Sequence, residues 1–313
     1  LAVQSATRKS SVVIPRGTYA YNPFVQHQIA EMYLALDAAG ATLDQSLGEK
    51  DGLVARYNFT LQDVDAFQLV GGQNPNTTTR SHDARITWNR VWNPATSTDF
   101  SVGYNRVSSL LLPDETSIGP TVFFNRSIDY LGPNSSVPLN RAQNTFRYAG
   151  RLQRTSGNHT LNAGFDVIRR QINGAESNGD RGIFSFRNDF GRSLIDNILS
   201  GSPSNYRQAF GDSHRGFRAW LPVFFAGDVW RASQRLTLNF GLRYEPAPRP
   251  REVNNLSEIP YDCDCNNWAP SFGFAYRAND RWGVFRASYS LQYGEIFAAT
   301  YMQARFNPPG ILN

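Results

Sequence analysis

The stretch from Trp230 to Glu245, WRASQRLTLNFGLRYE, constrains the fold more than any other part of the chain. After Arg235 every second residue is apolar, and the residues between are polar or glycine. A period of two predicts a β-strand with one apolar and one polar face. Its length of about ten residues suits a strand that crosses an outer membrane and exceeds the average soluble strand. With the apolar run before it, the stretch predicts a transmembrane β-hairpin.

Similar alternating strands recur along the chain, and tight polar turns join them in pairs. The sequence predicts about ten strands, at 51–61, 66–71, 84–92, 100–105, 146–152, 160–167, 217–230, 235–245, 268–276 and 282–293. Short connections alternate with long ones, which is the layout of outer-membrane barrels with periplasmic turns and extracellular loops. We place the first short turn at 62–65 and the longest loops at 106–142 and 171–215.

The fold class that follows is all-β, an antiparallel transmembrane β-barrel of which this chain supplies about ten strands. A soluble β-sandwich or propeller is the alternative, but it does not explain why the long loops fall on one side. Strand 217–230 has large apolar residues at both parities. Either face of it could meet lipid, or Pro222 marks a bulge that exchanges the faces.

Residues 1–50 are predicted to precede the barrel segment, which we place at 51–313. Asn22-Pro23 is a good helix start, apolar residues follow at helical spacing, and Gly40 can end the helix. This predicts a short amphipathic helix that packs on the main body or, alternatively, binds a partner. A second short helix is predicted near 190–199, ahead of Gly201 and Pro203. Leu1 begins without a signal-peptide pattern, which suggests a processed protein or a fragment.

Charge and motif content argue against several functions. The net charge of +5 is carried almost entirely by arginines, and these lie singly along the strands, unlike a nucleic-acid-binding cluster. Cys263 and Cys265 are too few for a structural zinc site, and a disulfide across one residue is strained. We interpret them as a loop feature that tolerates an oxidising compartment. No metal-ligand spacing and no catalytic motif is present, so we expect no metal, no cofactor and no enzyme activity.

Three sets of candidate functional residues follow from the alternation. Polar-face residues that we expect in the barrel lumen are Arg56, Arg85, Arg147, Arg151, Asn239, Arg243 and Arg286. Ligand-contact candidates in the extracellular loops are Phe123, Phe124, Tyr130, Tyr206 and Phe210. Aromatics beside the short turns, which fit a membrane-interface girdle, are Trp92, Phe100, Trp230, Tyr276 and Trp282. Lumen arginines either pair with acidic groups nearby or line a path for anionic ligands.

Two segments carry a family resemblance. FFAGDVWRASQRLTLNFGLRYE at 224–245 and NNWAPSFGFAYRANDRWGVFRASYSLQY at 266–293 resemble TonB-dependent outer-membrane transporters of the Oar-like type. GNHTLNAGFDVIRRQ, GDRGIFSF, DNILSGSPSNY and IPRGTYAYNPFVQHQIAEMY are also similar to that family. Gly227, Val229 and Ser271 depart from its usual residues. The similarity runs in pieces from about residue 14 to 293 and is weak between about 105 and 140.

The resemblance implies a barrel of about 22 strands, filled by a plug domain and energised by a TonB-type complex. It implies a ligand among siderophores, cobalamin, glycans, proteins or peptides, without selecting one. Neither the plug nor the TonB-contacting segment is visible in the sequence, so the chain resembles the middle of a transporter, in contact with outer-membrane lipid. A passive porin, or a soluble or surface β-protein with a binding or structural role, remains the alternative.

Overall fold

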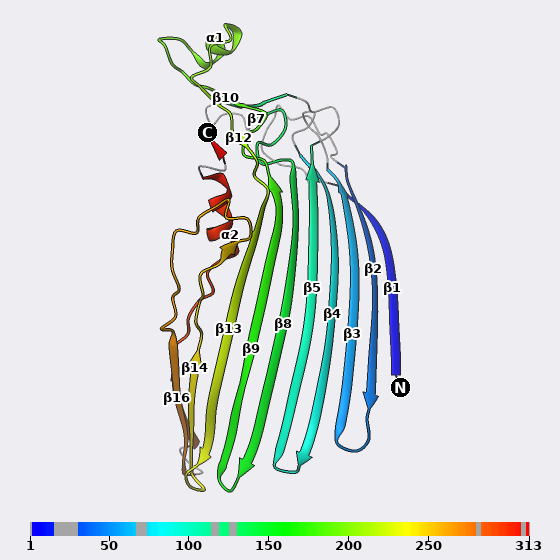
Figure 1. Cartoon of the computed structure of the whole chain (residues 1–313), viewed down its shortest axis with the longest axis vertical. Coiled ribbons are helices and arrows are strands. Elements are labelled where there is room, and N and C mark those ends of the chain that lie inside the picture. The colour runs from blue at the N-terminus through cyan, green and yellow to red at the C-terminus, as the bar shows by residue number, and fades with distance from the viewer. Residues whose placement is uncertain are drawn as a thin grey trace.

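The computed structural model describes residues 2–15, 31–66, 74–113, 119–124, 130–279, 283–307 and 311–312. Its main body is one antiparallel sheet of twelve strands in the described residues, drawn in Figure 1 as a tall curved wall. In sheet order the long strands are β1 (Ala2–Pro15), β2 (Glu31–Ser46), β3 (Asp51–Asp65), β4 (Asn76–Asn93), β5 (Thr96–Leu112), β8 (Leu139–Ser156), β9 (His159–Glu176), β13 (Arg215–Arg231), β14 (Leu236–Tyr244), β16 (Trp268–Asn279) and β17 (Gly283–Ser290). The short strand β15 (Arg251–Glu252) pairs with β13 beside β14.

Short and long connections lie at opposite ends of this sheet (Figure 1). Among the described residues, the short ones are 47–50, 94–95, 157–158 and 232–235, and the long ones include 177–214 and 245–267. The predicted one-sided layout is therefore confirmed. Two of the short turns contain residues that favour tight turns. Asn93 Oδ1 accepts a hydrogen bond from the Ala95 backbone N–H at 2.9 Å. Gly157 has φ +56° at the first central position of a two-residue hairpin turn.

The first 46 residues correct the sequence prediction. Residues 31–46 form β2, so the predicted helix is wrong from Glu31 onward, and residues 16–30 lie outside the described part. The predicted turn at 62–65 is also wrong, because β3 pairs with β4 continuously from Asp51 to Val64. The strand predicted at 66–71 falls largely outside the described residues. A boundary at residue 50 therefore does not divide the sheet, since β2 and β3 are joined as a hairpin.

Smaller elements gather at the long-loop end. A four-stranded sheet contains β6 (Thr121–Phe124), β7 (Tyr130–Leu131), β10 (Ile183–Phe186) and β11 (Asn205–Arg207), and β12 (Phe210–Gly211) pairs with β18 (Ile311–Leu312). The predicted second helix is confirmed as α1 (Leu194–Leu199), with Ser193 and Asp196 forming a capping box. Helix α2 (Ala298–Met302) and the 3₁₀ turn η1 (Gln303–Phe306) were not predicted from the sequence. No helix in the described residues is long and apolar enough to span a membrane.

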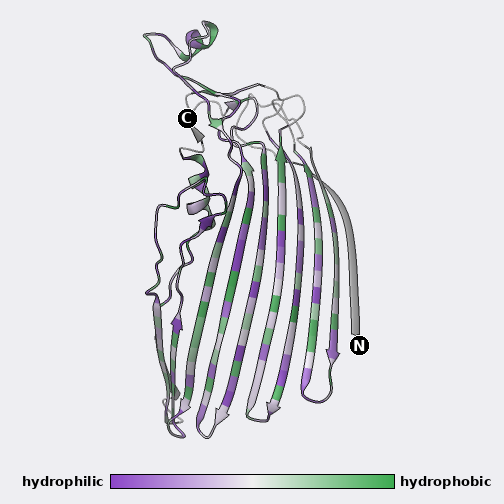
Figure 2. Cartoon of the chain, viewed as in Figure 1, coloured by the Kyte–Doolittle hydropathy of each residue, from purple (hydrophilic) through white to green (hydrophobic). Residues whose placement is uncertain are grey.

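Cross-strand register divides the sheet into two faces. Residues directly opposite each other share a face, so Trp88, Phe100, Gly150, Phe165 and Phe224 form one row across five strands. We call this side the aromatic face. A Cβ at Gly150 would lie 2.7 Å from the Phe165 ring; glycine there lets Phe100 and Phe165 approach to 6.3 Å. Figure 2 shows the resulting alternation of apolar and polar bands along the strands.

The buried core lies where other segments cover the opposite face of β9 and β13. It consists of Ile172, Phe217, Ala219, Ile259, Tyr301, Met302 and Ala304. Strand β13 keeps an unbroken register with β9 from Arg215 to Trp230, so Pro222 introduces no bulge. Trp220, Phe224 and Trp230 share the aromatic face, whereas Leu221 and Val223 point to the covered side. The apolar residues of one parity therefore lie on the exposed aromatic face, and those of the other parity lie on the covered side.

Candidate functional site: the arginine face and its covered cavity

All seven predicted polar-face residues share the face opposite the aromatic one, according to the register. We call it the arginine face, after Arg56, Arg85, Arg147, Arg151, Arg243 and Arg286. One row across it contains Arg56, Arg85, Gly103 and Arg147 on β3, β4, β5 and β8. All seven side chains are exposed on this single chain. Whether that face lines a lumen stays a prediction.

The six arginines differ in whether an acidic or polar group pairs with their guanidinium. Arg147 Nε donates to both carboxylate oxygens of Asp166, at 2.9 and 3.1 Å, and its Nη2 contacts the same group. Arg243 lies 2.6 Å from Glu245 Oε1, and Arg85 donates to Ser101 Oγ at 3.3 Å. Within the described residues, Arg56, Arg151 and Arg286 have no hydrogen-bonding or ionic partner. Arg56 stands directly opposite Arg85, an arrangement that is unfavourable unless an anion or acidic group is supplied.

Four of the five predicted loop aromatics come together in the small sheet at the long-loop end. Phe123 packs on Tyr130 at 5.6 Å, and Tyr206 packs on Phe184 at 4.6 Å. Phe124 stacks on Phe186 at 6.4 Å, through the parallel pairing of β6 with β10. Phe210 lies apart from them, in β12. Phe123, Tyr206 and Phe210 remain exposed, so a ligand could reach them; their role stays a prediction.

The aromatics beside the short turns lie on the aromatic face. Phe100, Trp230 and Tyr276 occupy it by register, and Trp92 Nε1 donates to Thr98 Oγ1 on that side at 3.0 Å. All four are exposed, which agrees with a girdle but does not test one. Trp282 lies outside the described residues.

A segment that the sequence did not single out crosses the arginine face. Residues 291–307, which we call the C-terminal strap, follow β17 and include α2 and η1. Glu295 forms an ion pair with Arg170 on β9. Tyr301 meets Phe217 edge-on at 5.8 Å, and Arg305 Nη1 donates to the Gly174 carbonyl at 3.2 Å. Phe217 and Tyr301 are 1% and 2% exposed, so the strap is packed against the sheet rather than lying loosely on it.

The connection 245–267 covers the same region from the other side. Glu252 on β15 accepts hydrogen bonds from the backbone N–H groups of Gly216, Asn254 and Leu256 at 2.8–3.0 Å. Burial raises the pKa of this carboxyl, but those three bonds and the nearby Arg215 outweigh it, so the pKa of Glu252 lies below its usual value. The carboxylate is therefore ionised at neutral pH and ties the connection to the start of β13.

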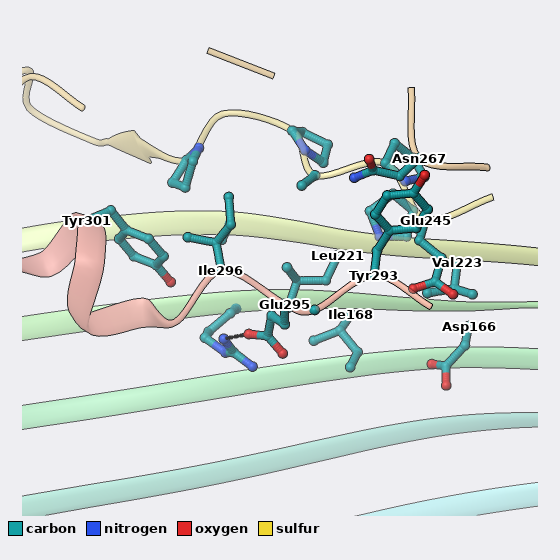
Figure 3. A pocket seen from close by; sticks show the side chains of 18 of the residues that line it. Asp166, Ile168, Leu221, Val223, Glu245, Asn267, Tyr293, Glu295, Ile296 and Tyr301 are labelled. Carbon is teal, nitrogen blue, oxygen red and sulfur yellow. Dashed lines mark hydrogen bonds and ion pairs between the residues drawn. The ribbon is translucent and has the colours of Figure 1, made fainter. Parts of the chain in front are cut away.

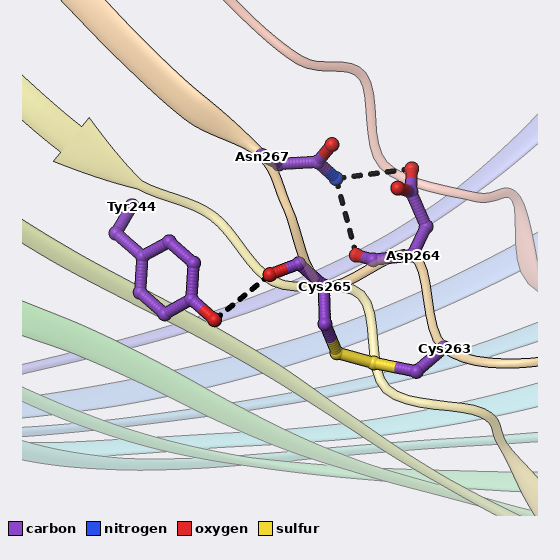
Figure 4. Close-up of a disulfide and its surroundings, with 5 residues drawn as sticks. All are labelled: Tyr244, Cys263, Asp264, Cys265 and Asn267. Carbon is purple, nitrogen blue, oxygen red and sulfur yellow. Dashed lines mark hydrogen bonds between the residues drawn. A yellow bond between two sulfur atoms is a disulfide. The ribbon is translucent and has the colours of Figure 1, made fainter.

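The same connection contains the two cysteines (Figure 4). They are joined as a disulfide, Cys263–Cys265, although the sequence argued against a bridge across one residue. Tyr244 Oη donates to the Cys265 carbonyl at 2.9 Å. Asn267 Nδ2 donates to the carbonyl and the carboxylate of Asp264. The bridge shapes an exposed part of the connection. Among the described residues no three His, Cys, Asp or Glu side chains are grouped to hold a metal ion.

A cavity of about 200 Å³ lies between these segments and the sheet. Its floor is formed by Ile168 on β9 with Leu221 and Val223 on β13. Figure 3 shows Ile168 and Leu221 between the carboxylates of Glu295 and Asp166, and Val223 stands directly opposite Asp166. Glu245 and several prolines of the connection close one side, and Tyr293, Glu295 and Tyr301 of the strap close another. Sequence reasoning missed this cavity because its walls come from four segments that lie far apart in the chain.

Comparisons with known proteins agree with this architecture. A family model described as "Outer membrane beta barrel domain" matches residues 21–264. Among solved structures, the outer membrane transporter YddB from Escherichia coli (TM-score 0.51, 12% identity, 88% of this chain covered) has a similar fold. BauA, the ferric preacinetobactin receptor from Acinetobacter baumannii, has a similar fold as well (TM-score 0.51, 13% identity, 89% of this chain covered). The ferric-catecholate import receptor Fiu from E. coli K12 is also similar (TM-score 0.51, 10% identity, 96% of this chain covered).

The chain spans 34%, 44% and 52% of those three proteins. No curated protein matches the sequence. At these identities the solved structures show the fold alone, whereas the family model covers most of the chain. An open antiparallel sheet with an aromatic face, a polar face and one-sided loops is part of such a barrel. The chain belongs to the outer membrane β-barrel domain family and is located in the outer membrane.

Proposed function

We propose that the protein is a receptor that carries a ligand inward across the outer membrane, energised by a TonB-type complex through a plug domain outside this chain. The observation that carries the proposal is the division of one long sheet into an aromatic face suited to lipid and an arginine face suited to an interior. The resemblance of 224–245 and 266–293 to TonB-dependent transporters of the Oar-like type supports the energised mechanism.

The long-loop end is where a ligand would first bind. The small sheet with Phe123, Tyr130 and Tyr206 offers aromatic surface there. Further in, Arg56, Arg151 and Arg286 offer positive charge without a partner in the described residues. These arginines meet either acidic groups of the plug or an anionic ligand. Two of the similar structures are named as receptors for ferric ligands, which makes iron chelates reasonable first ligands to screen.

A conductance measurement separates this function from that of a passive porin. The full-length protein is inserted into planar lipid bilayers, and current is recorded before and after mild denaturant is added to displace a plug. A plugged transporter shows no steady conductance at first and acquires it in denaturant. Steady conductance from the start would make the protein a porin and refute the proposal.

TonB dependence is tested by binding. The periplasmic domain of TonB from the same organism is expected to co-purify with the full-length protein but not with residues 1–313 expressed alone. If it binds neither, energised transport is excluded.

A further inference from the structure

A second group of arginines lies on the aromatic face, toward the long-loop end of the sheet. Arg169 on β9, Arg218 on β13 and Arg251 on β15 share that face by register, and we call them the membrane-boundary cluster. We propose that this cluster binds the phosphorylated headgroup of a lipid in the outer leaflet of the outer membrane. The inference goes beyond the proposed function, because a passive barrel would present the same surface to lipid.

The height of the cluster on the sheet matches the edge of a membrane. Trp220 and Trp230 share the aromatic face of β13, with Trp230 near the short-turn end. The ten residues between their positions rise roughly 33 Å along the strand. At a strand tilt of about 40° this is a height of about 25 Å, which equals the apolar band of outer-membrane barrels. The two tryptophans therefore mark the edges of the band, and Arg218 lies two residues beyond the outer edge.

The aromatic face changes from apolar to polar at the same height on four neighbouring strands. At the outer edge, one register row across β13, β9, β8 and β5 contains Trp220, Arg169, Phe146 and Tyr104. The next row toward the long loops contains Arg218, Gln171, Asn144 and Arg106. Three of the four residues in the first row are aromatic, whereas all four in the second are polar. A lipid here would place its acyl chains on the rings and its headgroup against the polar row.

The positive charge of the cluster is not balanced by carboxylates. Arg218 stands directly opposite Arg251, and Arg169 is its diagonal neighbour across β9. Among the residues that the structure describes, none of these three arginines forms an ion pair. Glu252 follows Arg251 but points to the opposite face, where it accepts three backbone hydrogen bonds. Like charges placed side by side are unfavourable unless an anion is supplied.

Several guanidinium donors of the cluster are left for a ligand. The hydrogen bonds of Arg218 in the described residues both come from Nη1, to Asn173 Oδ1 and to the Phe217 carbonyl at 2.9 Å. Arg169 lies over the Trp220 ring at 5.3 Å, and its Nε has no hydrogen-bond partner in the described residues. Arg251 is exposed. Guanidinium groups bind phosphate through paired N–H donors, and basic clusters at a membrane surface recognise anionic headgroups.

Native mass spectrometry of the full-length protein in neutral detergent tests the proposal with two lipids that differ only in phosphate. The probes are bisphosphorylated lipid A and the same lipid with both phosphates removed. Lipid A is expected to stay bound, and the dephosphorylated lipid to bind at least about tenfold more weakly, because charge-assisted hydrogen bonds are lost. Inorganic phosphate in excess should not displace lipid A, since it gains nothing from the apolar band.

Two outcomes of this comparison would overturn the proposal. Equal binding of both lipids would show an ordinary apolar lipid contact without headgroup recognition. Displacement of lipid A by inorganic phosphate would show a site for soluble anions instead.

Variants place the binding at the cluster. Arg169→Gln combined with Arg251→Gln removes two charges, keeps the Arg218–Asn173 hydrogen bond and is expected to weaken lipid A at least about tenfold. Arg187→Gln combined with Arg192→Gln is the matched control, because both residues are exposed and precede α1, which Figure 1 draws beyond the end of the main sheet. If the cluster variant binds lipid A as tightly as the control does, the site lies elsewhere.

A charge-retaining variant separates headgroup binding from a folding defect. Arg169→Lys combined with Arg251→Lys keeps both positive charges and should retain most of the binding to lipid A. A loss as large as that of the glutamine variant would show that altered packing is the cause, and would count against the site. These results do not depend on TonB: lipid A binding that requires the cluster would stand even if the protein proved to be a porin.

Discussion

Arg147 on β8 holds Asp166 on β9 with two hydrogen bonds from Nε at 2.9 and 3.1 Å and a further contact from Nη2. The pair lies at the edge of the covered cavity, because Asp166 lines it and Arg147 does not. It therefore joins the two parts of the arginine face: the open rows on β3, β4 and β8, and the part that the strap covers.

We expect this pair to orient Asp166 rather than to stabilise the sheet strongly. The side chains are 51% and 28% exposed, and exposed ion pairs contribute about 1 kcal/mol or less. A double-mutant cycle with Arg147→Ala and Asp166→Ala, followed by urea unfolding in detergent, is expected to give a coupling energy within that limit. A coupling of several kcal/mol would show that the pair is a structural centre of the sheet.

Reversing the charge of Arg56 should stabilise the sheet, because Arg56 and Arg85 stand directly opposite each other. Arg56→Glu replaces like charges with an ion pair and is expected to stabilise the isolated chain by up to about 1 kcal/mol. Arg286→Glu is the control, because Arg286 stands directly opposite Ala275 rather than opposite another arginine. If Arg56→Glu destabilises the chain as much as the control does, the two guanidinium groups are not in electrostatic contact.

The strap is expected to detach when its buried anchor is truncated. Tyr301→Ala removes a side chain that is 2% exposed, and loss of a buried aromatic side chain costs about 3–5 kcal/mol. Hydrogen exchange of residues 291–307 should accelerate while exchange in β8 and β9 stays slow. Phe297→Ala serves as the control, since Phe297 is 81% exposed and should change nothing. Unchanged exchange in Tyr301→Ala would mean that other contacts hold the strap.

Glu252 makes the attachment of connection 245–267 dependent on pH. Because its pKa in the folded protein lies below the unfolded value, its contribution is fully present above the unfolded pKa and is lost as pH falls through the folded pKa. Proteolysis of this connection should therefore increase on acidification. Glu252→Gln should raise cleavage at neutral pH and remove much of the acid dependence, whereas Glu258→Gln, at an exposed carboxylate, should behave as the wild type does.

The sequence predicts the strands best where one face is apolar and the other polar. β14 was identified with nearly its observed bounds, because Leu236, Leu238, Phe240 and Leu242 alternate without interruption. β2 was missed, because its run of alanines favours helix and its alternation is weak. Pairing with β1 and β3 supplies the backbone hydrogen bonds that decide its structure. Local propensity therefore misleads wherever a neighbouring strand determines the conformation.

The candidate site likewise has a part that the sequence predicts and a part that only the fold reveals. Its arginine face follows from parity along single strands, so the sequence could identify Arg147 and Arg243. Their partners differ in sequence distance: Glu245 is two residues from Arg243, whereas Asp166 is brought to Arg147 by the β8–β9 register. The cavity depends on strap and loop positions that no period encodes. Glu295 reaches Arg170 across more than a hundred residues, and only the assembled fold reveals that contact.

The central claim is that the aromatic face meets lipid and the arginine face meets the barrel interior. Nitroxide labels attached one at a time to cysteines introduced along 236–243 of β14, in a protein with Cys263 and Cys265 changed to serine, test it most directly. In lipid bilayers, labels at 236, 238, 240 and 242 should be relaxed by oxygen, which is enriched in lipid, and labels at 237, 239, 241 and 243 by a water-soluble nickel chelate. The reverse pattern, or labels that all respond to the chelate alone, would contradict the account.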